Sequence, residues 1–309
     1  MDQYVLVLNC GSSSIKFAII QAKTGTAPLH GLAENLGTAS SRLSFSYQNK
    51  QHNGELPADA NHQQALAVIA DTLQEFELLS QQIVAVGHRV VHGGETFTHS
   101  TLIDDQVKQA IEQTSLMAPL HNPANLAGIK SAQSAFPHLP HVAVFDTAFF
   151  QTMPKHAYLY ALPYELYQQH NIRRYGFHGS SHYFVAHEAA NALNKDITDC
   201  NLITAHLGNG CSIAAIRQGK AVDTSLGFTP LEGLIMGTRC GDIDPSLPTY
   251  LIEQLGYSVA QVSEVLNKES GLLGISKLSN DCRTLEQQAK DGNQQAQLAL
   301  DMFIYRLVK

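Results

Sequence analysis

Residues 4–20 have the sequence YVLVLNCGSSSIKFAII. Two apolar runs, 4–8 and 15–20, stand on either side of a short stretch of Gly, Ser and Asn. Apolar, β-branched runs separated by such a turn predict a β-hairpin. The stretch LITAHLGNGCSIAAIR, residues 202–217, repeats the arrangement of strand, glycine turn and strand. The repeat favours two similar domains of mixed α/β structure, although chance is an open alternative, since hairpins with glycine turns are common.

The remaining segments fit an α/β chain with two domains. Apolar residues at helical spacing predict helices over 62–79 and 122–135, and buried-type strands are expected over 83–91 and 141–145. The boundary is expected just after the second strand, which gives domains 1–150 and 151–309. Residues 293–309 form an amphipathic helix pattern without a Gly stop signal. We therefore expect the chain to be cut short at its C-terminal end.

Composition narrows the class of protein. Of 309 residues, 44% are apolar and 15% charged, which is typical of a globular chain. The formal net charge of −7 argues against a general nucleic-acid binder. The five cysteines contain no Cys-x-x-Cys pair, which favours a reducing compartment. No signal peptide and no apolar stretch of roughly 18 residues is found, so a cytoplasmic protein without membrane contact is expected.

Several common catalytic motifs are absent. The sequence contains no Gly-x-x-x-x-Gly-Lys-Ser/Thr, Gly-x-Gly-x-x-Gly, Gly-x-Ser-x-Gly or His-Glu-x-x-His. These absences weaken the case for a Rossmann dehydrogenase, a serine hydrolase or a zinc protease.

Three places in the first half carry candidate chemistry. The turn 9–14, followed by Lys16, offers backbone N–H groups and a cation to a phosphate, or is an ordinary hairpin turn. Arg89 ends a buried strand and suits a carboxylate or phosphate, or forms a structural salt bridge. Asp146 follows an apolar strand, where ligand groups collect in α/β sheets, or caps a helix.

The second half supplies a matching set. His178 stands between two glycines, and a metal site shared with His182 has little support without an acidic partner. His206 precedes a second glycine turn. Arg239 lies in a loop with glycines and acids, where it could contact a phosphoryl group or be tied to Asp242 or Asp244. Two small-residue turns, two Arg loops, a strand-end Asp and a His together favour phosphoryl transfer.

Eight longer strings occur in order along the chain. They are LVLNCGSSSIKFA from Leu6, GHRVVHGGE from Gly87, APLHNPAN from Ala118, VFDTAF from Val144, YGFHGSSH from Tyr175, HLGNG from His206, GFTPLEGLIMGTRCGDIDP from Gly227 and SNDCR from Ser279. On these strings the sequence is identified as a member of the acetokinase family, which includes acetate, propionate and butyrate kinases.

The resemblance implies a fold and an activity. The fold is the duplicated two-domain α/β fold of acetate and sugar kinases, heat-shock chaperone ATPases and actin, with a nucleotide-binding second domain. The activity is reversible phosphorylation of acetate by ATP to acetyl phosphate and ADP, with Mg²⁺ or Mn²⁺. The family also implies a homodimer.

The resemblance assigns roles residue by residue. Catalytic roles fall to Asp146, His178 and Arg239. Arg89 would bind the carboxylate of the substrate, and its methyl group would be enclosed by Val91, Leu120, Phe177 and Pro230. Asn9 would hold the metal ion. The nucleotide would be bound by Ser12, Ser14, Lys16, His206, Leu207, Gly208, Asn209, Gly210, Asp281, Cys282 and Arg283.

One role is refined by chemistry. Acetate resembles a side-chain carboxylate with a pKa of roughly 4–5, so it is ionised at pH 7 and needs no general base. We therefore expect Asp146 to orient Arg89 or a water on Mg²⁺, and the carboxylate oxygen to attack the γ-phosphorus directly in line.

The departures from the family keep alternatives open. The chain lacks the Gly-Ile-Gly-Glu-Asn loop that contacts the nucleotide and the Asn-Glu-Glu segment whose first Glu helps hold Mg²⁺. An impaired fragment is therefore one alternative. Propionate is a second, because one methylene is worth only about 1–3 kcal/mol in a pocket. A nucleotide-dependent binding or structural protein is the third, and the candidate carboxylate pocket argues against it.

Overall fold

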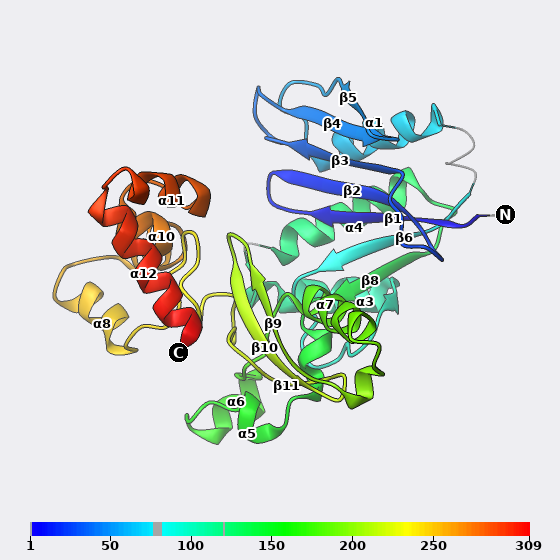
Figure 1. Ribbon diagram of the computed structural model, residues 1–309. Coiled ribbons are helices and arrows are strands. Elements are labelled where there is room, and N and C mark those ends of the chain that lie inside the picture. Colours follow the sequence, from blue (N-terminus) through cyan, green and yellow to red (C-terminus); the bar gives the residue numbers. More distant parts are fainter. Residues whose placement is uncertain (1, 77–81, 120) are drawn as a thin grey trace. The chain divides into compact units, whose positions relative to one another are not determined.

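The structure is a computed structural model that describes residues 2–76, 82–119 and 121–309 (Figure 1). The chain forms two compact units, Met1–Ala148 and Phe149–Lys309. The division lies close to the boundary expected after residue 150. No described helix is both long and apolar enough to cross a membrane.

The first unit is built on one eight-stranded sheet. Its strands follow the order β5-β4-β3-β2-β1-β6-β8-β7. Their bounds are β1 Tyr4–Cys10, β2 Ser14–Gln21, β3 Leu29–Glu34, β4 Arg42–Tyr47, β5 Lys50–Gly54, β6 Ile83–Val90, β7 Thr101–Leu102 and β8 His141–Phe145. β1 pairs antiparallel with β2 and parallel with β6, which confirms the predicted hairpin.

Two helices pack against one face of this sheet. Leu6 and Leu8 of β1 join a core with Leu66 and Ile69 of α1, His62–Gln74, and with Ala132 of α4, Asn122–Ala135. The helix predicted over 122–135 is confirmed. The helix predicted over 62–79 ends earlier, at Gln74, and its last predicted residues lie outside the described part. The unit also contains α3, Asp105–Gln113, and the short 3₁₀ helix η1, Thr114–Leu116.

The second unit contains a three-stranded antiparallel sheet in the order β11-β10-β9. The strands are β9 Asn201–Leu207, β10 Cys211–Arg217 and β11 Lys220–Thr224, so the second predicted hairpin is also confirmed. Helix α7, Gly179–Ala192, contacts β9. The other elements are η2 Ala148–Thr152, α5 Lys155–Tyr158, α6 Tyr164–His170, η3 Ile197–Asp199, α8 Ser246–Glu253 and α9 Val259–Lys268.

The last three helices of the described chain pack together around a small apolar core. Leu272 of α10, Gly271–Ser276, Leu285 of α11, Cys282–Lys290, and Ala299 of α12, Gln294–Val308, are buried together. The amphipathic helix predicted over 293–309 is confirmed as α12.

Candidate active site

Three polar side chains form a row across the open face of the first sheet. Asn9 on β1 pairs directly with Lys16 on β2, and such partners share a face. Leu8 pairs with His88 on β6, and both are buried. Because side chains alternate along a strand, the next residues, Asn9 and Arg89, lie on the opposite face. Lys16, Asn9 and Arg89 therefore stand on neighbouring strands, on the face away from Leu8 and His88.

Arg89 is held by a buried carboxylate. Its Nη2 lies 2.6 Å from Oδ2 of Asp146, and its Nε lies 3.1 Å from Oδ1. Asp146 is 1% exposed, whereas the Arg89 side chain is 37% exposed. Burial opposes the charge of Arg89, but Asp146 outweighs it, so the pKa of Arg89 is raised above its usual value. The salt-bridge alternative is thus realised, with the guanidinium still open on one side.

The end of strand β8 is locked in place around Asp146. The backbone N–H of Asp146 donates to Val90 O at 2.9 Å, which extends the pairing of β8 with β6. The backbone N–H of Gly93 donates to Thr147 Oγ1 at 3.1 Å. A Cβ on Gly93 would lie 2.7 Å from the Phe145 ring, so only glycine allows this approach. Asp146 therefore presents its carboxylate to Arg89 from a rigid strand end.

Two asparagines that the sequence analysis did not single out support this region. Asn125 donates from Nδ2 to Cys10 O at 2.7 Å and accepts from the backbone N–H of Val91 at 3.0 Å. Asn122 exchanges two hydrogen bonds with the backbone of His92. Both are buried on α4, and Asn125 connects the polar turn to the end of β6. Two amides in the predicted helix 122–135, within the string APLHNPAN, were the available signal.

The two histidines beside Arg89 are scaffold groups. His88 Nε2 lies 2.9 Å from His141 Nδ1, and burial together with His141 lowers the pKa of His88 to about 3. His92 Nδ1 accepts from the backbone N–H of Gly94 at 3.0 Å, and burial lowers its pKa to about 4.

In the second unit, His178 stands at the N-terminal end of α7. Its backbone is left-handed, with φ of 60°, and its ring stacks on His206 with centroids 4.1 Å apart. Its Nδ1 lies 2.8 Å from Ser212 Oγ. The glycine before Phe177 is needed for packing, because a Cβ on Gly176 would lie 2.6 Å from the Phe150 ring.

Gly210 brings the second glycine turn to His178 and Arg239. A Cβ placed on Gly210 would lie 3.3 Å from His178 Nε2 and 3.4 Å from Arg239 Nη1. The side chains of His178 and Arg239 thus border the same small space, which is open because residue 210 has no side chain.

Arg239 corrects one alternative from the sequence. Its Nη1 donates to the carbonyl of Pro230 at 2.9 Å. Asp242 instead accepts from Gly233 N, and Asp244 accepts from Ser246 N. Among the described residues no carboxylate pairs with Arg239, so the alternative in which Arg239 is tied to Asp242 or Asp244 is wrong. Burial lowers the pKa of Arg239, with Cys211 acting in the opposite direction.

The glycine turn also meets the loop that carries the string SNDCR. Asn209 Oδ1 accepts from Asn280 Nδ2 at 2.9 Å, and Asn209 O accepts from Gly237 N at 3.0 Å. Asp281 caps α11 and pairs with the exposed Arg283 at 2.8 Å. Hydrogen bonds from Arg283 lower the pKa of Asp281 to about 2.

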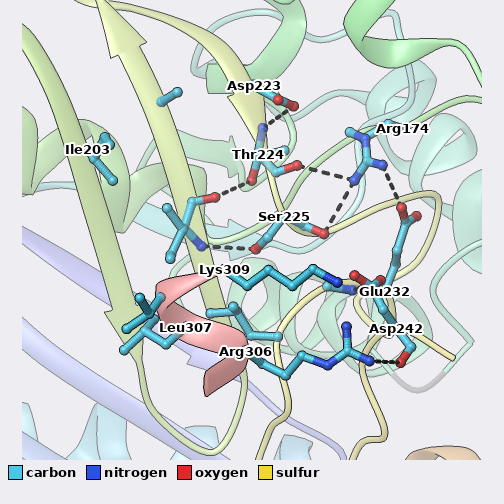
Figure 2. A pocket seen from close by; sticks show the side chains of 15 residues that line it. Arg174, Ile203, Asp223, Thr224, Ser225, Glu232, Asp242, Arg306, Leu307 and Lys309 are labelled. Carbon is cyan, nitrogen blue, oxygen red and sulfur yellow. Dashed lines mark hydrogen bonds and ion pairs between the residues drawn. The ribbon is translucent and has the colours of Figure 1, made fainter. Parts of the chain in front are cut away.

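A cavity of about 590 Å³ lies elsewhere in the second unit and contains none of the expected site residues (Figure 2). Arg174 pairs there with Glu232 at 2.5 Å and donates to the carbonyls of Thr224 and Ser225. Glu232 also accepts from Tyr160. The pair fixes the loop after β11, which includes Pro230, the acceptor of Arg239.

The remaining expected residues are placed as follows. Val91 and Phe177 are buried, Pro230 is half-buried, and Leu120 lies outside the described residues. Ser12 is exposed and Ser14 half-buried at the polar turn, and Leu207 and Gly208 are exposed at the end of β9. Cys282 begins α11. No group of three or more His, Cys, Asp or Glu with metal-site geometry occurs in the described part. Asn9, the residue expected to hold the metal ion, offers one amide oxygen as a ligand.

Comparison with known proteins gives a consistent result. The Acetokinase family model matches residues 4–309. The chain is 56% identical over 306 residues to the acetate kinase of Shewanella amazonensis, which covers 99% of this chain and 77% of that protein. It is 55% identical over 309 residues to the acetate kinase of Shewanella loihica.

Solved structures agree. A crystal structure of a propionate kinase from Francisella tularensis has a TM-score of 0.95 at 47% identity, over 99% of this chain and 78% of that one. The acetate kinase of Porphyromonas gingivalis has a TM-score of 0.91 at 46% identity, over 98% and 77% of the two chains.

Proposed function

The chain belongs to the acetokinase family, and on that premise we propose that it transfers the γ-phosphoryl group of ATP to acetate, reversibly, giving ADP and acetyl phosphate. The observation that carries the proposal is Arg239. It is a half-buried cation with no carboxylate partner among the described residues, and it borders one small space with His178. Positive and hydrogen-bonding groups held ready in this way stabilise the charge of a transferring phosphoryl group.

Arg89 is the proposed carboxylate anchor. A guanidinium has five N–H donors in a fork. Asp146 engages Nε and Nη2, which leaves the Nη1 edge of the fork for a second carboxylate. Asp146 therefore fixes the orientation of Arg89, which supports the positioning role over a general base.

Direct in-line attack follows from the ionisation of the substrate. Acetate carries its negative charge at neutral pH, so its oxygen can attack the γ-phosphorus without loss of a proton. Arg239 and His178 then offset the charge on the phosphoryl oxygens. Lys16, Ser12 and Ser14 are assigned to the ATP phosphates, and His206, the turn 207–210 and residues 281–283 to the nucleotide.

The residues present fit a divalent ion carried by the nucleotide. Mg²⁺ commonly keeps several waters and binds through one or two protein oxygens plus substrate phosphates. The Asn9 amide beside Lys16 matches that limited demand, and Asn9 is the residue proposed to hold Mg²⁺ or Mn²⁺. When bound, the ion would supply further neutralisation of the phosphate charge.

Val91, Leu120, Phe177 and Pro230 are assigned to the methyl group of the substrate. We also propose a homodimer in the cytoplasm, without nucleic acid or membrane as partners. The free state of the five cysteines supports a reducing compartment.

The test is trapping of acyl phosphate by hydroxylamine from ATP and Mg²⁺ on this 309-residue chain, with acetate, propionate and butyrate compared. We expect product from all three, with the highest kcat/KM for acetate. A higher kcat/KM for propionate would reassign the substrate. No product from any acid would contradict the proposal for this polypeptide.

A further inference from the structure

A chain of hydrogen bonds leads away from His178 into the interior of the second unit. His178 Nδ1 lies 2.8 Å from Ser212 Oγ, and Ser212 Oγ lies 2.8 Å from His182 Nε2. His182 Nδ1 lies 2.8 Å from Thr204 Oγ1. Ser212, His182 and Thr204 are buried, at 0%, 1% and 5% exposure. These three side chains are therefore shielded from bulk solvent.

Each of the two hydroxyl groups in this series of hydrogen bonds, on Ser212 and Thr204, has one proton to donate. Among the described residues, Ser212 Oγ bonds only to the two histidines, and Thr204 Oγ1 bonds only to His182. Burial, together with His206, lowers the pKa of His182 to about 4, so His182 is neutral at pH 7. One of its ring nitrogens donates and the other accepts.

Only one direction satisfies every buried proton. If Thr204 donates to His182 Nδ1, then His182 Nε2 donates to Ser212 and Ser212 donates to His178 Nδ1. In the reverse direction His182 donates to Thr204, and the Thr204 proton has no acceptor among the described residues. A buried donor without an acceptor costs about 1–3 kcal/mol, which is enough to select the first direction.

We infer that Thr204, His182 and Ser212 act as positioning residues that fix His178 as the neutral tautomer with its proton on Nε2. This inference rests on the proposed function for its catalytic consequence, although the tautomer itself does not. Nε2 is the nitrogen that faces the space beside Gly210 and Arg239. His178 therefore acts as a hydrogen-bond donor to a phosphoryl oxygen, and protonation of Nδ1 is opposed because it would leave the Ser212 proton without an acceptor.

The direct test is ¹⁵N NMR of the full chain labelled at histidine, with His178 assigned from the spectrum of His178→Gln. Protonated and unprotonated ring nitrogens are readily distinguished. We expect His178 with Nε2 protonated and Nδ1 unprotonated at pH 7. A proton on Nδ1 in the wild-type chain overturns the inference without the need for any variant.

Two matched variants test the chain of hydrogen bonds. Thr204→Val removes the terminal hydroxyl at nearly constant volume, so we expect the Nδ1–H tautomer of His178 to appear and kcat to fall about 3- to 10-fold with KM for acetate unchanged. Thr204→Ser keeps the hydroxyl and should restore both. Ser212→Ala should lower kcat by about 10- to 100-fold.

The outcomes separate this inference from the proposed function. If Thr204→Val leaves the tautomer and kcat as in the wild type, the positioning role is wrong. If the Nε2–H tautomer is found in a chain without kinase activity, the positioning role stands and the proposed function falls.

Discussion

The two arginines proposed for the reaction differ in their partners and in the direction in which their pKa values are shifted. Arg89 is bound on one edge by the buried carboxylate of Asp146, and its pKa is raised. Within the described part of the chain, the side chain of Arg239 has only a carbonyl and a thioether sulfur as hydrogen-bond partners, and burial lowers its pKa. A guanidinium paired with a carboxylate stays protonated and has a fixed orientation, which suits an anchor. An unpaired one keeps its charge for a group whose charge grows during the reaction.

The largest expected effect comes from removing the unpaired charge. Arg239→Ala should lower kcat by about 10³-fold or more, by analogy with arginine fingers, because it removes the guanidinium that lies beside Gly210 and His178. Arg217→Ala, at an exposed strand end, is the matched control and should keep wild-type kinetics. A loss of less than tenfold in steady-state assays would remove Arg239 from this role.

The paired arginine should respond differently. Asp146→Asn keeps the shape but removes the charge that orients Arg89, so we expect KM for acetate to rise about 10- to 100-fold, with a smaller fall in kcat. The measurement is the dependence of the initial rate on acetate concentration. If Asp146 acted as a general base, kcat would collapse at unchanged KM, and the anchor interpretation would be wrong.

The hydrogen bonds of Asn125, which connect β1 to the end of β6 near Arg89, should contribute to the stability of the protein. Asn125→Ala leaves Cys10 O and Val91 N without their buried partner, so the free energy of unfolding should drop by about 1–3 kcal/mol. Urea unfolding measures this change. Asn191→Ala, on the exposed face of α7, is the control. Equal effects of the two substitutions would show that the Asn125 bridge contributes nothing.

The smallest expected effect is a dependence on pH. His88 has a pKa of about 3 when folded and about 6.5 when unfolded, so between these values the unfolded chain binds more protons. Stability is therefore lost as the pH falls below 6.5, by about 1 kcal/mol from pH 6.5 to 5.5 for this group alone. Thermal unfolding against pH measures it. A melting temperature that stays level or rises over this interval would contradict the buried, neutral state.

Sequence patterns predicted the parts of the fold that depend on local periodicity. The two hairpins and the helix 122–135 were predicted from alternating or helical apolar spacing. The position of Asp146 at the end of a strand was predicted from the apolar run that precedes it. The C-terminal end of α1 could not be predicted from the sequence, because apolar residues continue at helical spacing beyond Gln74.

The electrostatic state of the site could not be predicted in the same way. Asp242 and Asp244 are close to Arg239 in sequence, so an ion pair was a reasonable alternative. The loop instead turns both carboxylates toward backbone N–H groups of residues 233 and 246. The bonds of Asn125 and Ser212 join residues far apart in sequence, and no short-range pattern encodes them.

Gly210 gives the second unit a property that no single side chain supplies. Its φ lies outside the left-handed region, so the backbone does not require glycine there. An added Cβ would nevertheless lie against both side chains, 3.3 Å from His178 Nε2 and 3.4 Å from Arg239 Nη1, so it would occupy the space between them. The missing side chain at position 210 is therefore what leaves room between His178 and Arg239, and an uncharged substitution such as Gly210→Ala would reduce that room without altering the charges around it.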